Sequence, residues 1–181
     1  MLDLKVICDI RKNAVNSILT DSDDEIIKSV WKKIIYVLTY YILPLGASSI
    51  AFWRNITLSS MQSYIGTGIA IFTGLFFSLL LSIGAKVRAE KENVNRDNAN
   101  FQRYKTSMKQ IANIILYIIV LGIIIFLIMI LNSILKSANY PCVEKIFTAI
   151  ALFLLGQFIV SLFFMIQRFY FLVRDEINNI L

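Results

Sequence analysis

The stretch Gly68–Gly84, GIAIFTGLFFSLLLSIG, contains no charged side chain. With the apolar residues just before it, this stretch is long enough to cross a hydrocarbon core of about 30 Å, which takes about 20 residues in a helix. It therefore predicts a membrane-spanning helix. Small side chains recur through it at every fourth position: Gly66, Ala70, Gly74, Ser78 and Ser82.

Three other windows have the same character, and the whole chain is rich in apolar residues. Its 181 residues are 57% hydrophobic and 17% charged, whereas soluble domains average about 45–50% and about 25%. The predicted spans are 34–53, 64–84, 111–135 and 146–167, and none contains Asp, Glu, Lys, Arg or His. Isolated apolar runs must satisfy their own backbone inside lipid, which excludes strands. The sequence predicts an all-α integral membrane protein with four transmembrane helices.

The basic residues are distributed unevenly between the two sides of these spans. The segment before the first span holds six, the loop between the second and third spans holds seven, and the C-terminal tail holds two of the 18. Because basic loops stay on the cytoplasmic side, both termini and the middle loop are predicted to be cytoplasmic. The expected location is the inner (plasma) membrane of a bacterium. Cys8 and Cys142 then lie on opposite sides of the membrane, so they cannot pair within one chain.

Three extramembrane parts flank the predicted transmembrane domain, residues 34–167. Residues 1–33 are expected to form an amphipathic cytoplasmic segment. Its first part is a short helix with apolar residues on one face, which lies on the inner membrane surface or against neighbouring subunits. A second helix starts where Ser22 and Glu25 can form a capping box. Residues 85–110 form a basic helical hairpin. Residues 168–181 form a cytoplasmic tail that continues the fourth span.

Pro44 interrupts the first predicted span near its middle. Proline removes a backbone donor, so a kink is expected there, and Pro44 is a hinge candidate. The polar residues around it have two interpretations: they repair the broken hydrogen-bond ladder, or they belong to a gate. These residues are Thr39, Tyr40, Ser48 and Ser49.

The chain offers little catalytic chemistry. It has no histidine, which removes Ser–His and Cys–His pairs and histidine metal sites. It has no phosphate-binding glycine loop either. The sequence therefore predicts no catalytic residue, no metal and no cofactor, and a protein that is not an enzyme. Spans without charged residues also argue against an ion-coupled exporter.

The series of small residues on the second span has two interpretations. Small residues allow helix backbones to approach closely, so the series predicts a packing seam. It also fits the wall of a pore between subunits, since the third span is aliphatic on nearly every side and is expected to face lipid. Such a pore would use further polar side chains: Thr73, Gln157 and Ser161.

The basic hairpin also has two interpretations. Its charge satisfies the topology rule and can rest on anionic lipid. It can instead bind a phosphate-bearing ligand, such as a nucleotide or oligonucleotide, with aromatic residues stacking on bases. The candidate residues are Arg88, Arg96, Arg103, Lys105, Phe101 and Tyr104.

The pattern WKKIIYVLTYYILPLGASSIAFW, followed by the second span and the basic hairpin, resembles small bacterial membrane effectors of anti-phage and nucleotide-signalling systems. In SLATT-type domains a pair of membrane helices precedes a charged cytoplasmic helix. The second pair of spans departs from that pattern and looks more like the channel subunit of Hailong-type defence. The resemblance is one of architecture and carries over no site residue. It implies an oligomeric pore that opens on a cytoplasmic signal and depolarises the membrane.

The sequence thus favours a homo-oligomeric channel or pore-forming effector that is gated from the cytoplasmic side. Its partners would be the lipid bilayer, other copies of itself and a cytoplasmic regulatory protein or nucleotide signal. The alternative is a non-conducting membrane scaffold that tethers a cytoplasmic partner. A small-molecule exporter is the third hypothesis, and the charge-free spans speak against it.

Overall fold

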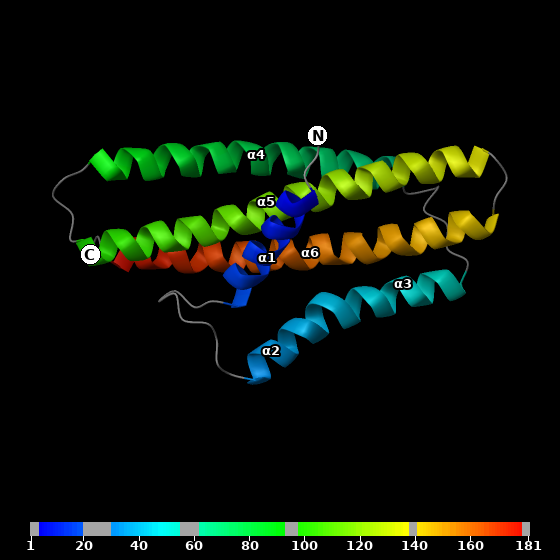
Figure 1. The fold of residues 1–181 in the computed structure, drawn as a ribbon, viewed down its shortest axis with the longest axis horizontal. Helices are drawn as coiled ribbons and strands as arrows, with labels where there is room; N and C mark the ends of the chain where they lie inside the picture. The colour runs from blue at the N-terminus through cyan, green and yellow to red at the C-terminus, as the bar shows by residue number, and fades with distance from the viewer. Residues whose placement is uncertain (1–3, 20–29, 55–61, 93–97, 138–140, 179–181) are drawn as a thin grey trace.

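A computed structural model describes residues 4–19, 30–54, 62–92, 98–137 and 141–178 (Figure 1). These residues are helical almost throughout and include no strand, which confirms the all-α prediction. The helices are α1 (Leu4–Leu19), α2 (Val30–Val37), the π-helical turn η1 (Leu38–Ile42), α3 (Leu43–Trp53), α4 (Gln62–Glu92), α5 (Asn98–Ser137) and α6 (Pro141–Asn178).

Four segments are long and apolar enough to cross a membrane, as predicted. They are Ile34–Trp53, Gln62–Lys86, Tyr104–Ile134 and Cys142–Arg174. Each is an unbroken helix except the first, which consists of α2, η1 and α3. The protein is a multi-pass membrane protein.

The four spans lie in a row rather than in a closed bundle. Figure 1 looks along the shortest dimension of the molecule and shows them in the order α4, α5, α6, α3. The main packing pairs follow the same order, because α5 packs on α4 and α6, and α3 packs on α6. Two spans, α4 and α3, therefore form the edges of the row.

Helix α5 lies inside this row, which corrects the expectation that the third span faces lipid. Its aliphatic side chains form the centre of the core: Ile111, Ile114, Ile115, Ile118 and Ile125 are almost completely buried. A helix that is apolar on every side can be buried among other helices as well as face lipid. The second span is the least buried of the four.

The predicted kink in the first span takes the form of a π-helical turn. The Leu43 N–H donates to the Leu38 carbonyl, five residues back, and Pro44 follows at the start of α3. A π turn adds a residue to the helical turn, so the chain can pass Pro44 without a break in the helix. The side chains of Ser48 and Ser49 donate to the Leu45 carbonyl, within their own helix.

The amphipathic helix α1 crosses the row and packs against α5 (Figure 1). Ala14 and Ile18 are buried in this contact, whereas Lys5 and Lys12 are exposed. The predicted amphipathic helix is therefore present, but it packs on α5 of its own chain, whereas it was expected on the membrane surface or against neighbouring subunits. The predicted capping box at Ser22 and Glu25 lies outside the described residues.

One end of the row carries exposed basic side chains. Helix α4 ends there at Glu92, α5 begins there at Asn98, and α6 continues there to Asn178. The extensions of α4 and α5 match the helical hairpin expected over residues 85–110, and α6 continues past the fourth span as expected. We call this the basic end, and its exposed basic residues are Lys86, Arg88, Lys105, Lys109 and Arg174.

Candidate functional site

A cluster of three hydroxyl groups lies inside the row, beside the π turn. The Tyr40 hydroxyl donates to the Tyr117 hydroxyl at 2.7 Å, and the Ser161 hydroxyl donates to Tyr40 at 3.3 Å. All three residues are buried, with Ser161 fully inaccessible. Because lipid offers no hydrogen-bond partner, these groups satisfy one another. The cluster joins the first, third and fourth spans.

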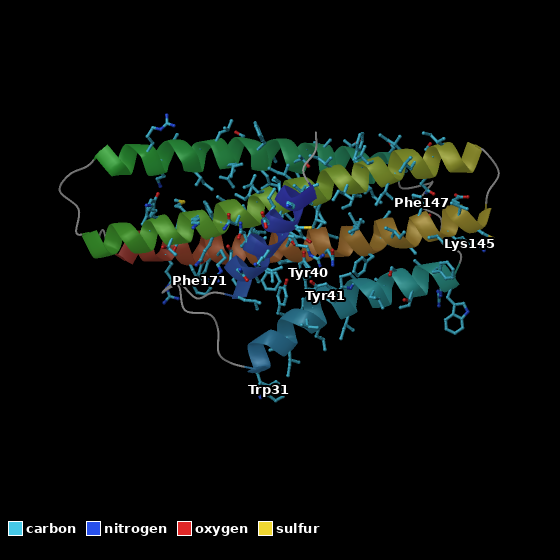
Figure 2. All side chains as sticks on the ribbon, viewed as in Figure 1. Trp31, Tyr40, Tyr41, Lys145, Phe147 and Phe171 are labelled. Carbon is cyan, nitrogen blue, oxygen red and sulfur yellow. The ribbon has the colours of Figure 1, made fainter. Side chains whose placement is uncertain are left out.

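Aromatic packing around the bend holds Tyr40 in this position. The rings of Tyr36 and Tyr40 stack with centroids 5.2 Å apart, and Tyr36 also contacts Phe164 of α6. Tyr41 lies edge-on to Tyr40, 5.1 Å away, and Figure 2 shows both beside the bend. The π turn thus places two consecutive tyrosines in two environments. Tyr40 points into the core, and Tyr41 lies at its margin.

Arg11 connects α1 to this margin. Its guanidinium donates to the Tyr41 hydroxyl at 3.2 Å. This hydrogen bond, followed by nearby tyrosines, raises the pKa of Arg11 above its ordinary value, against the opposing effect of burial. The hydrogen bond therefore ties α1 to the bent span through a charged donor.

The C-terminal end of α1 is tied to the spans as well. The Arg168 guanidinium of α6 donates to the carbonyls of Ser17 and Ile18 at 3.1 and 3.3 Å. The Asn113 amide of α5 donates to the Ser17 hydroxyl at 3.1 Å. The last carbonyls of a helix lack intrahelical partners, and a cation there also suits the helix dipole. Helix α1 is thus held near its middle, at Arg11, and at its C-terminal end.

Two glycines allow the closest contacts between spans. A Cβ at Gly156 would lie 2.7 Å from Pro44 Cβ, and a Cβ at Gly122 would lie 2.8 Å from Thr73 Oγ1. Gly156 therefore lets α3 approach α6, and Gly122 lets α4 approach α5. Neither glycine was among the residues predicted to be important. The sequence feature that could have indicated them is a lone glycine in a long aliphatic span, which often marks a close contact between helices.

The series of small residues on α4 does not lie at these close contacts between spans. Gly66 is half-buried, whereas Ala70, Gly74, Ser78 and Ser82 are exposed, and a Cβ at Gly66 or Gly74 would meet nothing within 4 Å. Residues four apart are rotated by about 40° around a helix, so the series winds by about 160° over its length. It leaves the packed side of α4 and turns toward the outside of the row.

The other predicted pore residues are on the packed side of their helices. Thr73 contacts the Gly122 position, and its hydroxyl has no hydrogen-bond partner among the residues that the structure describes. Gln157 and Ser161 are buried among the spans. A pore between copies would be lined by exposed groups, so these three do not border it in this conformation. Pro44, the hinge candidate, is buried against Gly156.

The candidate ligand residues of the hairpin are distributed along the helices of the basic end. Arg88 on α4 and Lys105 on α5 are exposed, and Tyr104 is half-buried. Phe101 and Arg103 lie on the first turns of α5. Arg96 lies outside the described residues. The members whose side chains the structure describes, Arg88, Tyr104 and Lys105, are divided between two helices.

The described residues include no group of three or more His, Cys, Asp or Glu side chains that could hold a metal ion. Cys8 on α1 and Cys142 at the start of α6 are both free and exposed. No family model, no curated protein and no solved structure matches the chain. The proposed function therefore rests on the geometry of the chain itself.

Proposed function

We propose that this membrane protein is the subunit of a homo-oligomeric channel that is gated from the cytoplasmic side. The observation that carries this proposal is the placement of α4. It is an edge span whose outward face carries small and hydroxyl side chains between large exposed apolar ones. The small and hydroxyl residues are Ala70, Gly74, Ser78 and Ser82, and a Cβ at Gly74 would meet no atom of the described residues within 4 Å.

Copies of the chain associate through this face. Membrane helices gain little from the hydrophobic effect when they associate, so they depend on close packing, which small residues permit. Ala70 and Gly74 lie near the middle of the span and serve that packing. The α4 helices then surround an axis, with the rest of each row outside them.

The conduit is lined by Ser78 and Ser82, which lie closer to the basic end. Their hydroxyls offer weak dipoles, and the apolar residues between them form constrictions that can close by dewetting. Because the spans contain no charged ring, the pore itself selects weakly between cations and anions. The exposed basic residues around its mouth concentrate anions there.

Gating acts through α1 and the bent span. Helix α1 holds Tyr41 through Arg11 and is itself held by Arg168. The Tyr40 side chain reaches from the same π turn to Tyr117 and Ser161. A cytoplasmic signal that displaces α1 therefore acts on the bend of the first span, and π turns are common at functional positions.

The biological setting follows from the resemblance to small bacterial effectors. The channel resides in the bacterial inner membrane, opens on a nucleotide signal or regulatory protein during phage infection, and depolarises the cell. The nucleotide or oligonucleotide signal would contact the basic end.

One observation favours the alternative, a non-conducting scaffold. Helices α4 and α5 extend beyond their apolar spans as basic helices. Such extensions suit a partner-binding platform as well as a channel mouth. An oligomer that never conducts would support this alternative.

The assembly step is tested with Gly74→Leu. We expect this bulky side chain to reduce the purified oligomer to smaller species, measured by mass photometry or light scattering in detergent. Gly84→Leu is the matched control, because Gly84 also has nothing within 4 Å but lies outside the series. Equal masses for the wild type and Gly74→Leu would remove α4 as the interface.

A further inference from the structure

An apolar groove of about 550 Å³ runs between α4 and α6. This volume lies within the usual range of ligand sites, about 300–1,000 Å³. The groove is lined only by hydrophobic side chains: Phe72, Phe76, Leu79, Ile159, Leu162, Phe163, Met165, Ile166 and Phe169. Within a membrane, such a surface is filled by hydrocarbon.

The groove has the depth of one leaflet. It extends from Ile159 to Phe169 along α6, a rise of about 15 Å, or half of a hydrocarbon core of about 30 Å. Near its deep end, Phe72 of α4 meets Phe158 of α6 edge to face, with centroids 6.5 Å apart. Its other end, at Leu79 and Phe169, points toward the basic end of the molecule.

The groove and α1 lie on opposite faces of the row. Asn113 of α5 bonds to α1, whereas Gly122 of α5 faces Ile69 of α4 and Phe158 of α6. These two residues are nine positions apart, so at about 100° per residue they point to opposite sides of the helix. Helix α1 therefore does not cover the groove.

The groove is also distinct from the proposed subunit interface. Gly74 and Phe76 of α4 are two positions apart, so they point about 200° apart around the helix. Gly74 belongs to the outward face, whereas Phe76 lines the groove. A second copy packed against Gly74 therefore leaves the side of α4 that carries Phe72 and Phe76 open to lipid.

We propose that this groove binds one acyl chain of an anionic phospholipid from the leaflet at the basic end. The chain enters beside Leu79 and Phe169 and reaches the Phe72–Phe158 contact. The headgroup then lies at the level of the exposed Lys86 on α4 and Arg174 on α6. Lys86 is seven positions from Leu79, so the two residues lie on nearly the same side of α4. Each basic residue near a membrane surface favours anionic lipid. The inference does not depend on channel activity.

The test uses tryptophan quenching by phospholipids with brominated acyl chains. In a background with Trp31 and Trp53 changed to Phe, Phe76→Trp places an indole in the groove. Ile42→Trp is the control, because Ile42 is exposed on the opposite edge span. It lies two residues from Tyr40, which bonds to Ser161 at the level of the groove on α6. Both variants are reconstituted into phosphatidylcholine vesicles that contain a small fraction of brominated phosphatidylglycerol.

We compare the fraction of brominated phosphatidylglycerol at which quenching is half-maximal. This fraction should be about ten times lower for the indole at position 76 than for the indole at position 42. Brominated phosphatidylcholine should show no such difference. Identical quenching curves at both positions would overturn the proposal, because they would mean ordinary boundary lipid. A strong effect of both brominated lipids at position 76 would overturn the headgroup preference.

Discussion

At the scale of single residues, the contact between Gly156 and Pro44 makes the sharpest prediction. Gly156→Ala would place a methyl group 2.7 Å from Pro44 Cβ and 3.2 Å from its Cα, and a proline backbone cannot move away easily. We expect a loss of about 1–3 kcal/mol in unfolding free energy, measured by denaturant titration in mixed micelles. Gly84→Ala, which meets nothing within 4 Å, should show no loss. Equal stability of the two variants would mean that α3 does not pack closely on α6.

The hydroxyl cluster makes a second prediction at this scale. Tyr117→Phe keeps the ring and removes the acceptor of the 2.7 Å bond from Tyr40. Hydrogen bonds between membrane helices contribute about 0.6 kcal/mol on average and rarely more than about 1.7, so we expect a loss in that range in the same titration. Tyr64→Phe is the control, because Tyr64 is 81% exposed. A stability change as small as that of the control would contradict a structural role for the cluster.

At the scale of elements, the docking of α1 is the feature that a single substitution can test. Arg168→Gln removes a charged donor from the Ser17 and Ile18 carbonyls. Hydrogen bonds to charged groups contribute about 1.5–3 kcal/mol, so amide hydrogen exchange in α1 should accelerate about tenfold or more. Arg174→Gln on the same helix should leave exchange unchanged, because Arg174 is exposed. Unchanged exchange in Arg168→Gln would show that α1 is held by other contacts.

The elements themselves could be predicted from the sequence more fully than their packing could. Length, charge-free runs and Pro44 were enough to predict four spans and a bend. The order of the row was not predictable, because a helix face toward lipid and a helix face toward protein are both apolar. The aliphatic α5 was therefore expected at the surface, although it lies in the core. The series from Gly66 to Ser82 was predicted to form one packing seam or pore wall, although a four-residue repeat winds around the helix.

The candidate site was predictable only in part. Tyr40 stood out because polar residues cluster near Pro44, but its partners Tyr117 and Ser161 are 77 and 121 positions away. Ser161 was selected as a pore residue instead of a partner for Tyr40. Arg11 was one of several charges on an amphipathic helix, and nothing in the local pattern pointed to Tyr41.

At the scale of the whole molecule, the predicted topology can be tested with the two native cysteines. Both thiols are exposed, and the topology places Cys8 in the cytoplasm and Cys142 outside. A membrane-impermeant maleimide added to intact spheroplasts should label the wild type and Cys8→Ser equally, and it should leave Cys142→Ser unlabelled. After lysis, Cys142→Ser should be labelled too, because the reagent then reaches Cys8 on the cytoplasmic side. The reverse pattern would contradict the predicted orientation.

The central claim is that copies of this chain form a conducting pore, and ion flux through purified protein in liposomes tests it most directly. The oligomeric mass is measured on the same sample, and α1 is released by combining Arg11→Gln with Arg168→Gln. We predict a defined oligomer whose flux rises when α1 is released, and whose cation flux falls when Ser78→Lys is added without a change in mass. Ser78→Ala should preserve the flux. A monomer, or a stable oligomer that stays silent even after α1 is released, would contradict the account.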